Sequence, residues 1–204
     1  GRGIRLVTTD KELQEGYETV TSESIAAVGK SAIIVEKFLE KTRHIEYQMC
    51  RDKHGNTVHL FERECSIQRR NQKLIEQTPS PVVDDAKREE IGELVVKAAQ
   101  AVDYTNLGTA EFLRADSGEF YFIEINARLQ VEHPVTETIF RVDLVKEQLR
   151  VASGEEMTFK QEDLEIKGHS IEVRINAEKL PNFTPCPGTV STFHAPGGLG
   201  VRMD

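Results

Sequence analysis

Two carboxylates, Glu111 and Glu124, are spaced so that they could bind one divalent cation. They lie in two apolar segments that alternate as strands, 107–115 and 119–126, which Ser117-Gly118 joins. With this pair as a two-residue turn, Glu111 lies directly opposite Glu124. Opposed carboxylates repel each other because their Cβ atoms are only about 5 Å apart. A hard cation such as Mg²⁺ would compensate the repulsion and keep coordination sites for phosphate oxygens, so the spacing predicts a cation site that serves phosphate chemistry.

The same alternation predicts which side chains share the face of that site. Glu111 and Leu113 are expected on one face with Phe122, Glu124 and Asn126, whose amide oxygen would be a third ligand. Five apolar side chains surround the two carboxylates: Phe112, Phe120, Phe122, Ile123 and Ile125. A segment this apolar is not expected to face water on both sides, which disfavours a solvated hairpin with scattered acids. The prediction depends on the register, because a slip of one residue would separate the pair.

A polar run follows the second of these strands. In extended geometry Arg128, Gln130 and Glu132 would share one side. The guanidinium could then clamp a small oxyanion, and the carboxylate beside it could act as a general base. Without other context, a surface ion pair between Arg128 and Glu132 would be about as common. Two further polar runs, 65–73 and Glu172-Val173-Arg174, would ordinarily be a solvated loop and an exposed ion pair.

The composition limits the classes of protein to consider. The 204 residues carry a formal net charge of −8, with 38% hydrophobic and 29% charged residues. We expect no nucleic-acid partner, since clustered positive charge is lacking, and no membrane partner, since no apolar run approaches the length of a membrane span. The three cysteines, Cys50, Cys65 and Cys186, are odd in number and widely spaced. They are expected to be reduced thiols rather than a disulfide framework or a zinc site.

Periodicity and turn signals distribute these side chains over helices and strands. Helices are expected over 9–29, 84–102 and 143–152, the first as two helices because Ser22-Glu23-Ser24 can begin a new one. Further strands are expected over 32–38, 43–51, 57–64, 169–177 and 189–193. Hairpins mixed with helices indicate an antiparallel-rich α+β layer. Gly1-Arg2-Gly3 could end a phosphate-binding loop, although three residues are a weak signal.

Together, these residues make the chain similar to a biotin carboxylase, a member of the ATP-grasp superfamily. The Glu-x-Asn pair at 124–126 alone would indicate only an ATP-grasp enzyme. Two longer runs narrow the resemblance to biotin-dependent carboxylases: Gln68-Arg69-Arg70-Asn71-Gln72-Lys73 and Arg128-Leu129-Gln130-Val131-Glu132-His133-Pro134. Further matching segments extend it over nearly the whole chain: 36–39, 43–46, 64–70, 122–126, 128–137 and 172–178.

The resemblance implies an α+β ATP-grasp fold, a mostly antiparallel sheet with packed helices, which is incomplete in this chain. Residues 1–37 would be the remainder of the small ATP-grasp lid, and residues 38–154 the main ATP-grasp portion. Residues 168–204 would begin the biotin carboxylase C-terminal domain. The family's N-terminal domain, with the lysines that reach the ATP phosphates, has no counterpart here. The chain by itself is therefore expected to be inactive or very weak.

The activity that the resemblance implies has two steps. ATP phosphorylates bicarbonate to carboxyphosphate, and N1′ of biotin captures the released CO2. The implied cofactors and substrates are ATP, Mg²⁺ or Mn²⁺, bicarbonate, and biotin on a carrier protein or domain. The implied partners are that biotin carboxyl carrier, a carboxyltransferase and a second copy in a homodimer. The implied compartment is the cytoplasm, or the mitochondrial matrix in a eukaryote, and the acyl acceptor cannot be read from this chain.

The resemblance also implies which side chains contact the nucleotide and the metal. The base and hinge region of ATP would be lined by Glu36, Lys37 and Leu39, and the ribose by His44 and Asn71. Further ATP contacts would be Phe38, Gln68 and Leu113. The metal ligands would be Glu111, Glu124 and Asn126, of which the two carboxylates also belong to the ATP site. The family often has His at the position of Asn71, so we expect a changed nucleotide affinity rather than lost chemistry.

The implied catalytic side chains are Lys73, Arg128, Glu132 and Arg174. Bicarbonate would be held by Lys73, Arg128, Gln130 and Val131. Glu132 would be the base that deprotonates bicarbonate, and Arg174 would stabilise negative charge on the ureido oxygen of biotin. Two alternatives remain: another ATP-grasp ligase, similar to carbamoyl-phosphate synthase, and a folded fragment that binds a cation or a partner without catalysis.

Overall fold

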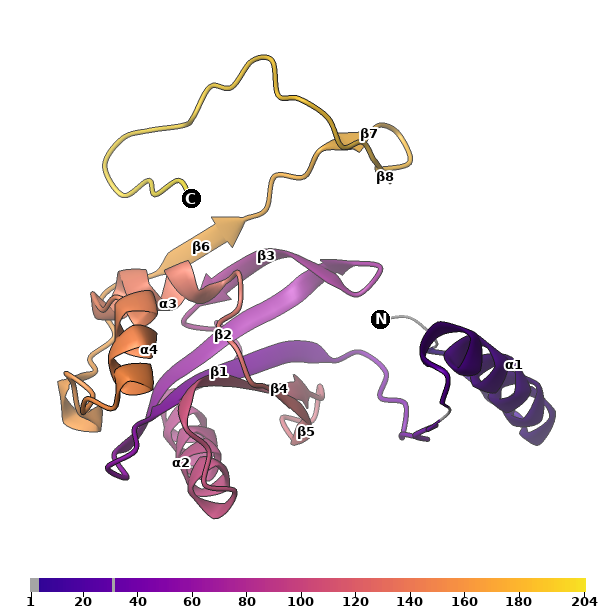
Figure 1. Cartoon of the computed structure of the whole chain (residues 1–204), viewed down its shortest axis with the longest axis horizontal. Helices are drawn as coiled ribbons and strands as arrows, with labels where there is room; N and C mark the ends of the chain where they lie inside the picture. The colour runs from indigo at the N-terminus through magenta and orange to yellow at the C-terminus, as the bar shows by residue number, and fades with distance from the viewer. Residues whose placement is uncertain (1–3, 31) are drawn as a thin grey trace. The chain divides into compact units, whose positions relative to one another are not determined.

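The computed structural model describes residues 4–30 and 32–204, and the chain separates into two units, one up to Val173 and one over Arg174–Asp204 (Figure 1). The predicted phosphate-loop remnant Gly1-Arg2-Gly3 lies outside the described residues. Within the described part of the chain, no helix combines the length and the apolar character needed to cross a membrane.

A six-stranded antiparallel sheet forms the frame of the first unit, in the order β5-β4-β1-β2-β3-β6 (Figure 1). Its strands are β1 Arg43–Arg51, β2 Thr57–Arg69, β3 Gln72–Thr78, β4 Asn106–Arg114, β5 Phe120–Asn126 and β6 Ser170–Val173. The strands predicted over 43–51, 107–115 and 119–126 are present within one residue of their expected ends. The architecture confirms the predicted antiparallel-rich α+β class.

Helices cover both faces of this sheet. α2 (Asp85–Ala101) packs on one face, where Ile91, Val95 and Ala99 join an apolar cluster with β1 and β4. α3 (His133–Phe140), α4 (Leu144–Ser153) and a 3-10 turn, Gln161–Asp163, pack on the other side. In Figure 1, α2 lies below the strands, and α3 and α4 lie to their left.

The alternation of β1 makes one face apolar and the other partly charged. Ile45, Tyr47 and Met49 point to the α2 cluster. On the opposite face, Cys50 joins the apolar cluster beneath α3 and α4. Glu46 and Gln48 lie on the same face as Cys50, and both are 0% exposed. A buried polar region therefore lies next to the apolar cluster beneath α3 and α4. The polar groups buried in this region need hydrogen-bond or ion-pair partners.

A buried ion pair fixes α2 to the sheet. Arg88 donates two hydrogen bonds to Glu62 of β2, from Nε to Oε2 at 2.8 Å and from Nη2 to Oε1 at 3.0 Å. The helix begins where the sequence predicts it, because the Asp84 side chain caps it by accepting from the Lys87 amide at 2.8 Å.

Gly92 allows α2 to approach the sheet closely. A Cβ at this position would lie 2.4–2.6 Å from three ring atoms of His59. His59 is only 2% exposed, so its ring has little room to move away. We expect Gly92→Ala to lower the free energy of unfolding by about 1–3 kcal/mol, because overpacking outweighs the better helix propensity of Ala. Thermal unfolding would measure the change. Gln100→Ala, at an exposed position of the same helix, is the control and should not lower the midpoint.

The first helix differs from its prediction. α1 (Asp10–Val28) is one continuous helix with Thr9 as its N-cap, and Gly29 ends it in the left-handed conformation at φ 72°. The second start expected at Ser22 does not occur, because the Ser22 hydroxyl donates to the Thr19 carbonyl oxygen at 2.8 Å instead of capping a new helix.

Two predicted strands are absent from the part of the chain that the structure describes, those at 32–38 and 189–193. Ile34 and Val35 are 83% and 70% exposed. A strand needs a hydrogen-bonded neighbour, and β-branched residues alone do not supply one. The second unit instead has a short ladder between β7 (Glu178–Lys179) and β8 (Thr184–Pro185).

The strand predicted over 169–177 is shorter than expected. β6 ends at Val173, and Ile171 and Val173 are 60% and 55% exposed, whereas Glu172 is half-buried. Ile171 and Val173 are exposed because β6 is an edge strand, while α2 packs against β1 and β2 on that face of the sheet.

Candidate active site

The β4–β5 hairpin brings the two predicted carboxylates together. Glu111 pairs directly with Glu124, which confirms the predicted register at this point. Between this pair and the turn, β5 has one extra residue, Ile123, so that Phe112 pairs with Phe122. The bulge reverses the alternation, and the two phenyl rings pack on the α2 side with centroids 5.7 Å apart. The prediction that Phe122 shares the face of Glu111 is therefore wrong.

A row of charged residues crosses four neighbouring strands at this level. Arg63 of β2 pairs with Glu46 of β1. Glu46 also pairs with Glu111 of β4, which in turn pairs with Glu124 of β5. The adjacent row on the same face holds Gln48, Thr109 and Asn126. Three carboxylates thus lie side by side, and positive charge must lie among them to offset their repulsion.

Lys73 of β3 supplies part of that positive charge. Its ammonium donates to Glu132 Oε1 at 2.6 Å and to Glu111 Oε1 at 2.9 Å, and it also contacts Glu46. Burial opposes the charged forms, yet the neighbouring carboxylates raise the pKa of Lys73 above its ordinary value. Burial likewise opposes ionisation of Glu46, but Arg63 and the other cations hold the pKa of Glu46 well below its usual range. Lys73 and Glu46 are therefore both charged at neutral pH.

The segment between β5 and α3 places two predicted site residues against this cluster. Gln130 and Glu132 are 5% and 2% exposed. Gln130 Nε2 donates to Glu111 Oε1 at 2.8 Å. The extended run predicted through Glu132 is wrong in its last part, because the chain turns at residues 131–132 and α3 begins at His133. Pro134 suits the first turn of that helix, where its missing N–H is not needed.

The other predicted oxyanion residues lie at the edge of the cluster. Arg128 is exposed, and its guanidinium donates to Asn126 Oδ1 at 3.4 Å. Val131 is 60% exposed. The side chains of Arg128 and Val131 are therefore exposed to solvent, unlike that of buried Gln130.

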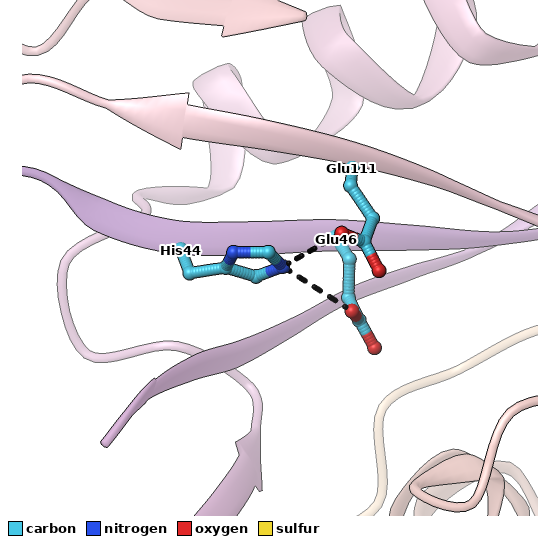
Figure 2. A group of neighbouring side chains, drawn as sticks. All are labelled: His44, Glu46 and Glu111. Carbon is cyan, nitrogen blue, oxygen red and sulfur yellow. Dashed lines mark ion pairs between the residues drawn. The ribbon is translucent and has the colours of Figure 1, made fainter. Parts of the chain in front are cut away.

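Figure 2 shows the His44 imidazole directed at the carboxylates of Glu46 and Glu111. Its Nε2 lies 3.6 Å from Glu46 Oε2 and 3.3 Å from Glu111 Oε2. Burial disfavours the imidazolium, but the adjacent carboxylates of Glu111 and Glu46 raise the pKa of His44 to about 9. The three side chains have the spacing of metal ligands. A protonated imidazole has no lone pair to offer, however, so at neutral pH His44 acts as a cation of the cluster.

The charge on His44 predicts a pH dependence of stability. Its folded pKa of about 9 lies above the ordinary 6.5, so the native state binds the extra proton between these values. The stabilisation is complete below pH 6.5 and is lost as pH rises through about 9, with an upper size of about 3 kcal/mol. Urea unfolding of wild type and His44→Gln, in chelator, should show a difference that shrinks across this window. A constant difference would contradict the assignment.

The predicted metal ligands have suitable chemistry. Burial opposes ionisation of Glu111, but the adjacent His44 imidazole and the hydrogen bond from Lys73 lower its pKa to about 2. Asn126 Nδ2 donates to Glu111 Oε1 at 3.0 Å and to Glu124 Oε1 at 3.3 Å. Two carboxylates and an amide are hard oxygen ligands of the kind that Mg²⁺ and Mn²⁺ take, so the residues fit. For Asn126 to be a ligand, its amide must turn so that Oδ1 faces the carboxylates.

Some of the predicted nucleotide contacts lie in the chain before β1 and others in β4. Glu36, Lys37 and Phe38 are exposed and Leu39 is half-buried, in irregular chain that precedes β1. Leu113 pairs with His44 in the row next to Glu111.

The β2–β3 hairpin carries the remaining nucleotide candidates. The polar run 65–73 is not a loop, because β2 extends to Arg69 and β3 begins at Gln72. Gln68 pairs directly with Lys73. Asn71 is a turn residue at φ 62°, a left-handed conformation that Asn tolerates better than most residues. The predicted residue Arg174 begins the second unit.

Sequence reasoning missed the two most buried members of the cluster, Glu46 and Arg63. Alternation over 43–51 places Glu46 opposite the apolar face of its strand, but an exposed face would look the same. Arg63 lies between Glu62 and Glu64 in the sequence, and such a charged run gives no signal of burial.

Comparison with known proteins gives matches over the whole chain. The family model described as carbamoyl-phosphate synthase L chain, ATP binding domain, matches residues 1–160. The chain is 53% identical to a subunit of the pyruvate carboxylase of Methanothermobacter thermautotrophicus and covers 42% of it. It is 51% identical to the biotin carboxylase of a Nostoc species and covers 46% of it. In both cases the whole chain is matched. The chain thus spans less than half the length of these relatives.

Solved structures give the same result. The biotin carboxylase domain dimer of Hydrogenobacter thermophilus 2-oxoglutarate carboxylase, in complex with MgADP, ADP and bicarbonate, matches with a TM-score of 0.95 and 49% identity. The match covers 98% of this chain and 45% of that one. The Campylobacter jejuni biotin carboxylase complex with β-γ-ATP matches with a TM-score of 0.94 and 42% identity, over 98% of this chain and 45% of the other.

Proposed function

The chain belongs to the carbamoyl-phosphate synthase L chain, ATP-binding domain family and is a homologue of the biotin carboxylases, and on this premise we propose that the full-length protein carboxylates biotin. The observation that carries the proposal is the convergence of Lys73, Gln130 and Glu132. Two donors and a buried carboxylate meet beside the acidic row of Glu111 and Glu124. This arrangement suits an oxyanion that must lose a proton next to ATP phosphates.

We propose that Glu111, Glu124 and Asn126 hold a divalent cation on the ATP phosphates. When bound, the cation supplies neutralisation of phosphate charge. The ionised state of Glu111 and the opposed position of Glu124 support this role. Around it, the proposed ATP contacts are Glu36, Lys37, Phe38, Leu39, His44, Gln68, Asn71 and Leu113. Positioning and charge neutralisation are the main contributions that phosphoryl transfer requires.

Bicarbonate is proposed to bind at Lys73 and Gln130, with Arg128 and Val131 at the solvent side. Glu132 removes the proton of the bicarbonate hydroxyl, and the oxygen attacks the γ-phosphorus of ATP. The bond from that phosphorus to the ADP oxygen breaks, and carboxyphosphate forms. Carboxyphosphate releases CO2 and phosphate, and N1′ of biotin attacks CO2 while the released phosphate takes the N1′ proton. Arg174 stabilises the negative charge on the ureido oxygen.

Assembly and compartment are also proposals. Biotin is presented on a carrier protein or domain, a carboxyltransferase uses the carboxybiotin, and two copies form a homodimer. One relative is a single subunit of a carboxylase and another is a domain dimer, and both facts support an enzyme with several parts. The unpaired state of all three cysteines supports a reducing compartment, the cytoplasm or a mitochondrial matrix.

Steady-state ATP hydrolysis by the full-length protein tests the function. We expect hydrolysis to require bicarbonate and to rise when free biotin is added. The alternative of a carbamoyl-phosphate synthase-like ligase shares the family model. That alternative predicts turnover with an amino or carboxylate substrate and no response to biotin.

A further inference from the structure

Arg63 is a fully buried guanidinium at the centre of the site. Its residue exposure is 0%, and it lies in the charged row beside Glu46. Nε donates to Glu46 Oε1 at 2.7 Å. The other two nitrogens donate to side-chain oxygens of three elements and a loop: Gln48 at 2.8 Å, Thr136 at 3.0 Å, Gln130 at 3.2 Å and Thr109 at 3.3 Å. One side chain therefore links β1, β4, α3 and the segment that carries Gln130.

The contact with Gln130 determines which way its amide faces. A guanidinium can only donate hydrogen bonds, so the acceptor of the bond from Arg63 Nη2 must be the amide oxygen of Gln130. The amide nitrogen then faces the opposite way and donates to Glu111 Oε1 at 2.8 Å. If the amide were reversed, an NH2 group would face the guanidinium and an oxygen would face a carboxylate. Both contacts would be repulsive, so Arg63 and Glu111 together hold one orientation.

We propose that Arg63 is a positioning residue for bicarbonate, which acts by fixing the amide of Gln130; this inference rests on the proposed function. The guanidinium fork is the part that matters, because its two terminal nitrogens reach Gln130 and the hydroxyls at the same time. Lysine would keep the charge beside Glu46 but would present a single nitrogen. The Gln130 amide would then lose its fixed orientation.

Arg88 offers a matched control, because it binds Glu62, the residue of β2 that precedes Arg63. It too is a buried arginine, 7% exposed, and it holds the adjacent carboxylate Glu62 with two hydrogen bonds. Its hydrogen-bond partners are Glu62, Asp85 and Val83, and all three lie outside the set of candidate site residues. Arg88→Lys therefore removes a buried guanidinium and its paired hydrogen bonds without a change at Gln130.

The test is steady-state ATP hydrolysis by the full-length protein with bicarbonate and MgATP varied in turn. We expect Arg63→Lys to raise the KM for bicarbonate about tenfold, the effect of one lost orienting hydrogen bond, and to change the KM for MgATP by less than about twofold. Arg88→Lys should leave both KM values unchanged. A smaller folded fraction lowers the maximal rate and moves neither KM, so the split separates positioning from stability.

A double-mutant cycle tests the route through Gln130. In a Gln130→Ala background, adding Arg63→Lys should raise the bicarbonate KM no further, whereas independent effects would multiply. If Arg63→Lys does not fold, Thr136→Val removes one acceptor of the same guanidinium and should raise the bicarbonate KM about threefold.

An unchanged bicarbonate KM in Arg63→Lys, or in Thr136→Val where it is needed, overturns the inference, and so does a multiplicative double mutant. In either case a wild-type enzyme that responds to bicarbonate leaves the proposed function intact. A wild type with no bicarbonate response overturns both.

Discussion

Replacement of Glu132 by Gln in the full-length protein is expected to reduce bicarbonate-dependent ATP hydrolysis by about a hundredfold or more. The carboxylate is 2% exposed, and its Oε1 accepts from Lys73 Nζ at 2.6 Å. An amide keeps the size and an acceptor for Lys73 but cannot take a proton from bicarbonate. General-base catalysis typically contributes a factor of about 10² to 10⁴, which sets the size of the effect. Initial rates at saturating ATP and bicarbonate would measure it.

Glu137→Gln is the matched control for this variant. Glu137 is also a buried carboxylate, 8% exposed, and lies on α3 only five residues further along. Its Oε1 accepts from the Leu144 amide at 2.6 Å, a structural contact that an amide oxygen can replace. Both variants should unfold at similar temperatures, but only Glu132→Gln should lose activity. Retained activity in Glu132→Gln would remove Glu132 from the role of base.

The second large effect is expected for Lys73→Met. The change removes the ammonium that Glu46, Glu111 and Glu132 share while leaving these carboxylates buried at 0%, 8% and 2% exposure. Removal of one partner from a buried ion-pair cluster typically costs about 3–5 kcal/mol, because the remaining charge is uncompensated. We expect a loss of this size in urea unfolding at pH 7, together with at least about a hundredfold loss of bicarbonate-dependent hydrolysis.

Lys87→Met serves as the comparison for the loss of a lysine charge. Lys87 pairs with Glu90 at 2.6 Å, and the two side chains are 37% and 57% exposed. A surface pair of this kind is worth about 0–1 kcal/mol, so the variant should unfold close to wild type. If Lys73→Met unfolded at the same urea concentration as Lys87→Met, the three carboxylates would not depend on Lys73 for their charge balance.

Local signals were enough to predict the central hairpin and the main helix. The turn at Ser117-Gly118 and the alternation on both sides of it gave the opposition of Glu111 and Glu124. The same local signals failed at Ile123, because an inserted residue changes the face of Phe122 without any change in composition. The strand expected over 32–38 failed for a related reason, since a strand depends on a neighbour that composition does not reveal.

The sequence by itself determined the family resemblance, the opposed carboxylates and the set of residues offered for the site. Only the tertiary structure decided that Glu46 and Arg63 belong to the same charged row. Glu46 and Glu111 are adjacent across the β1–β4 ladder although 65 positions separate them, and that pairing follows from how the whole sheet assembles. Burial then gives these groups their importance, because charges removed from water must find partners in a fixed geometry. Sequence alone carries no measure of that burial.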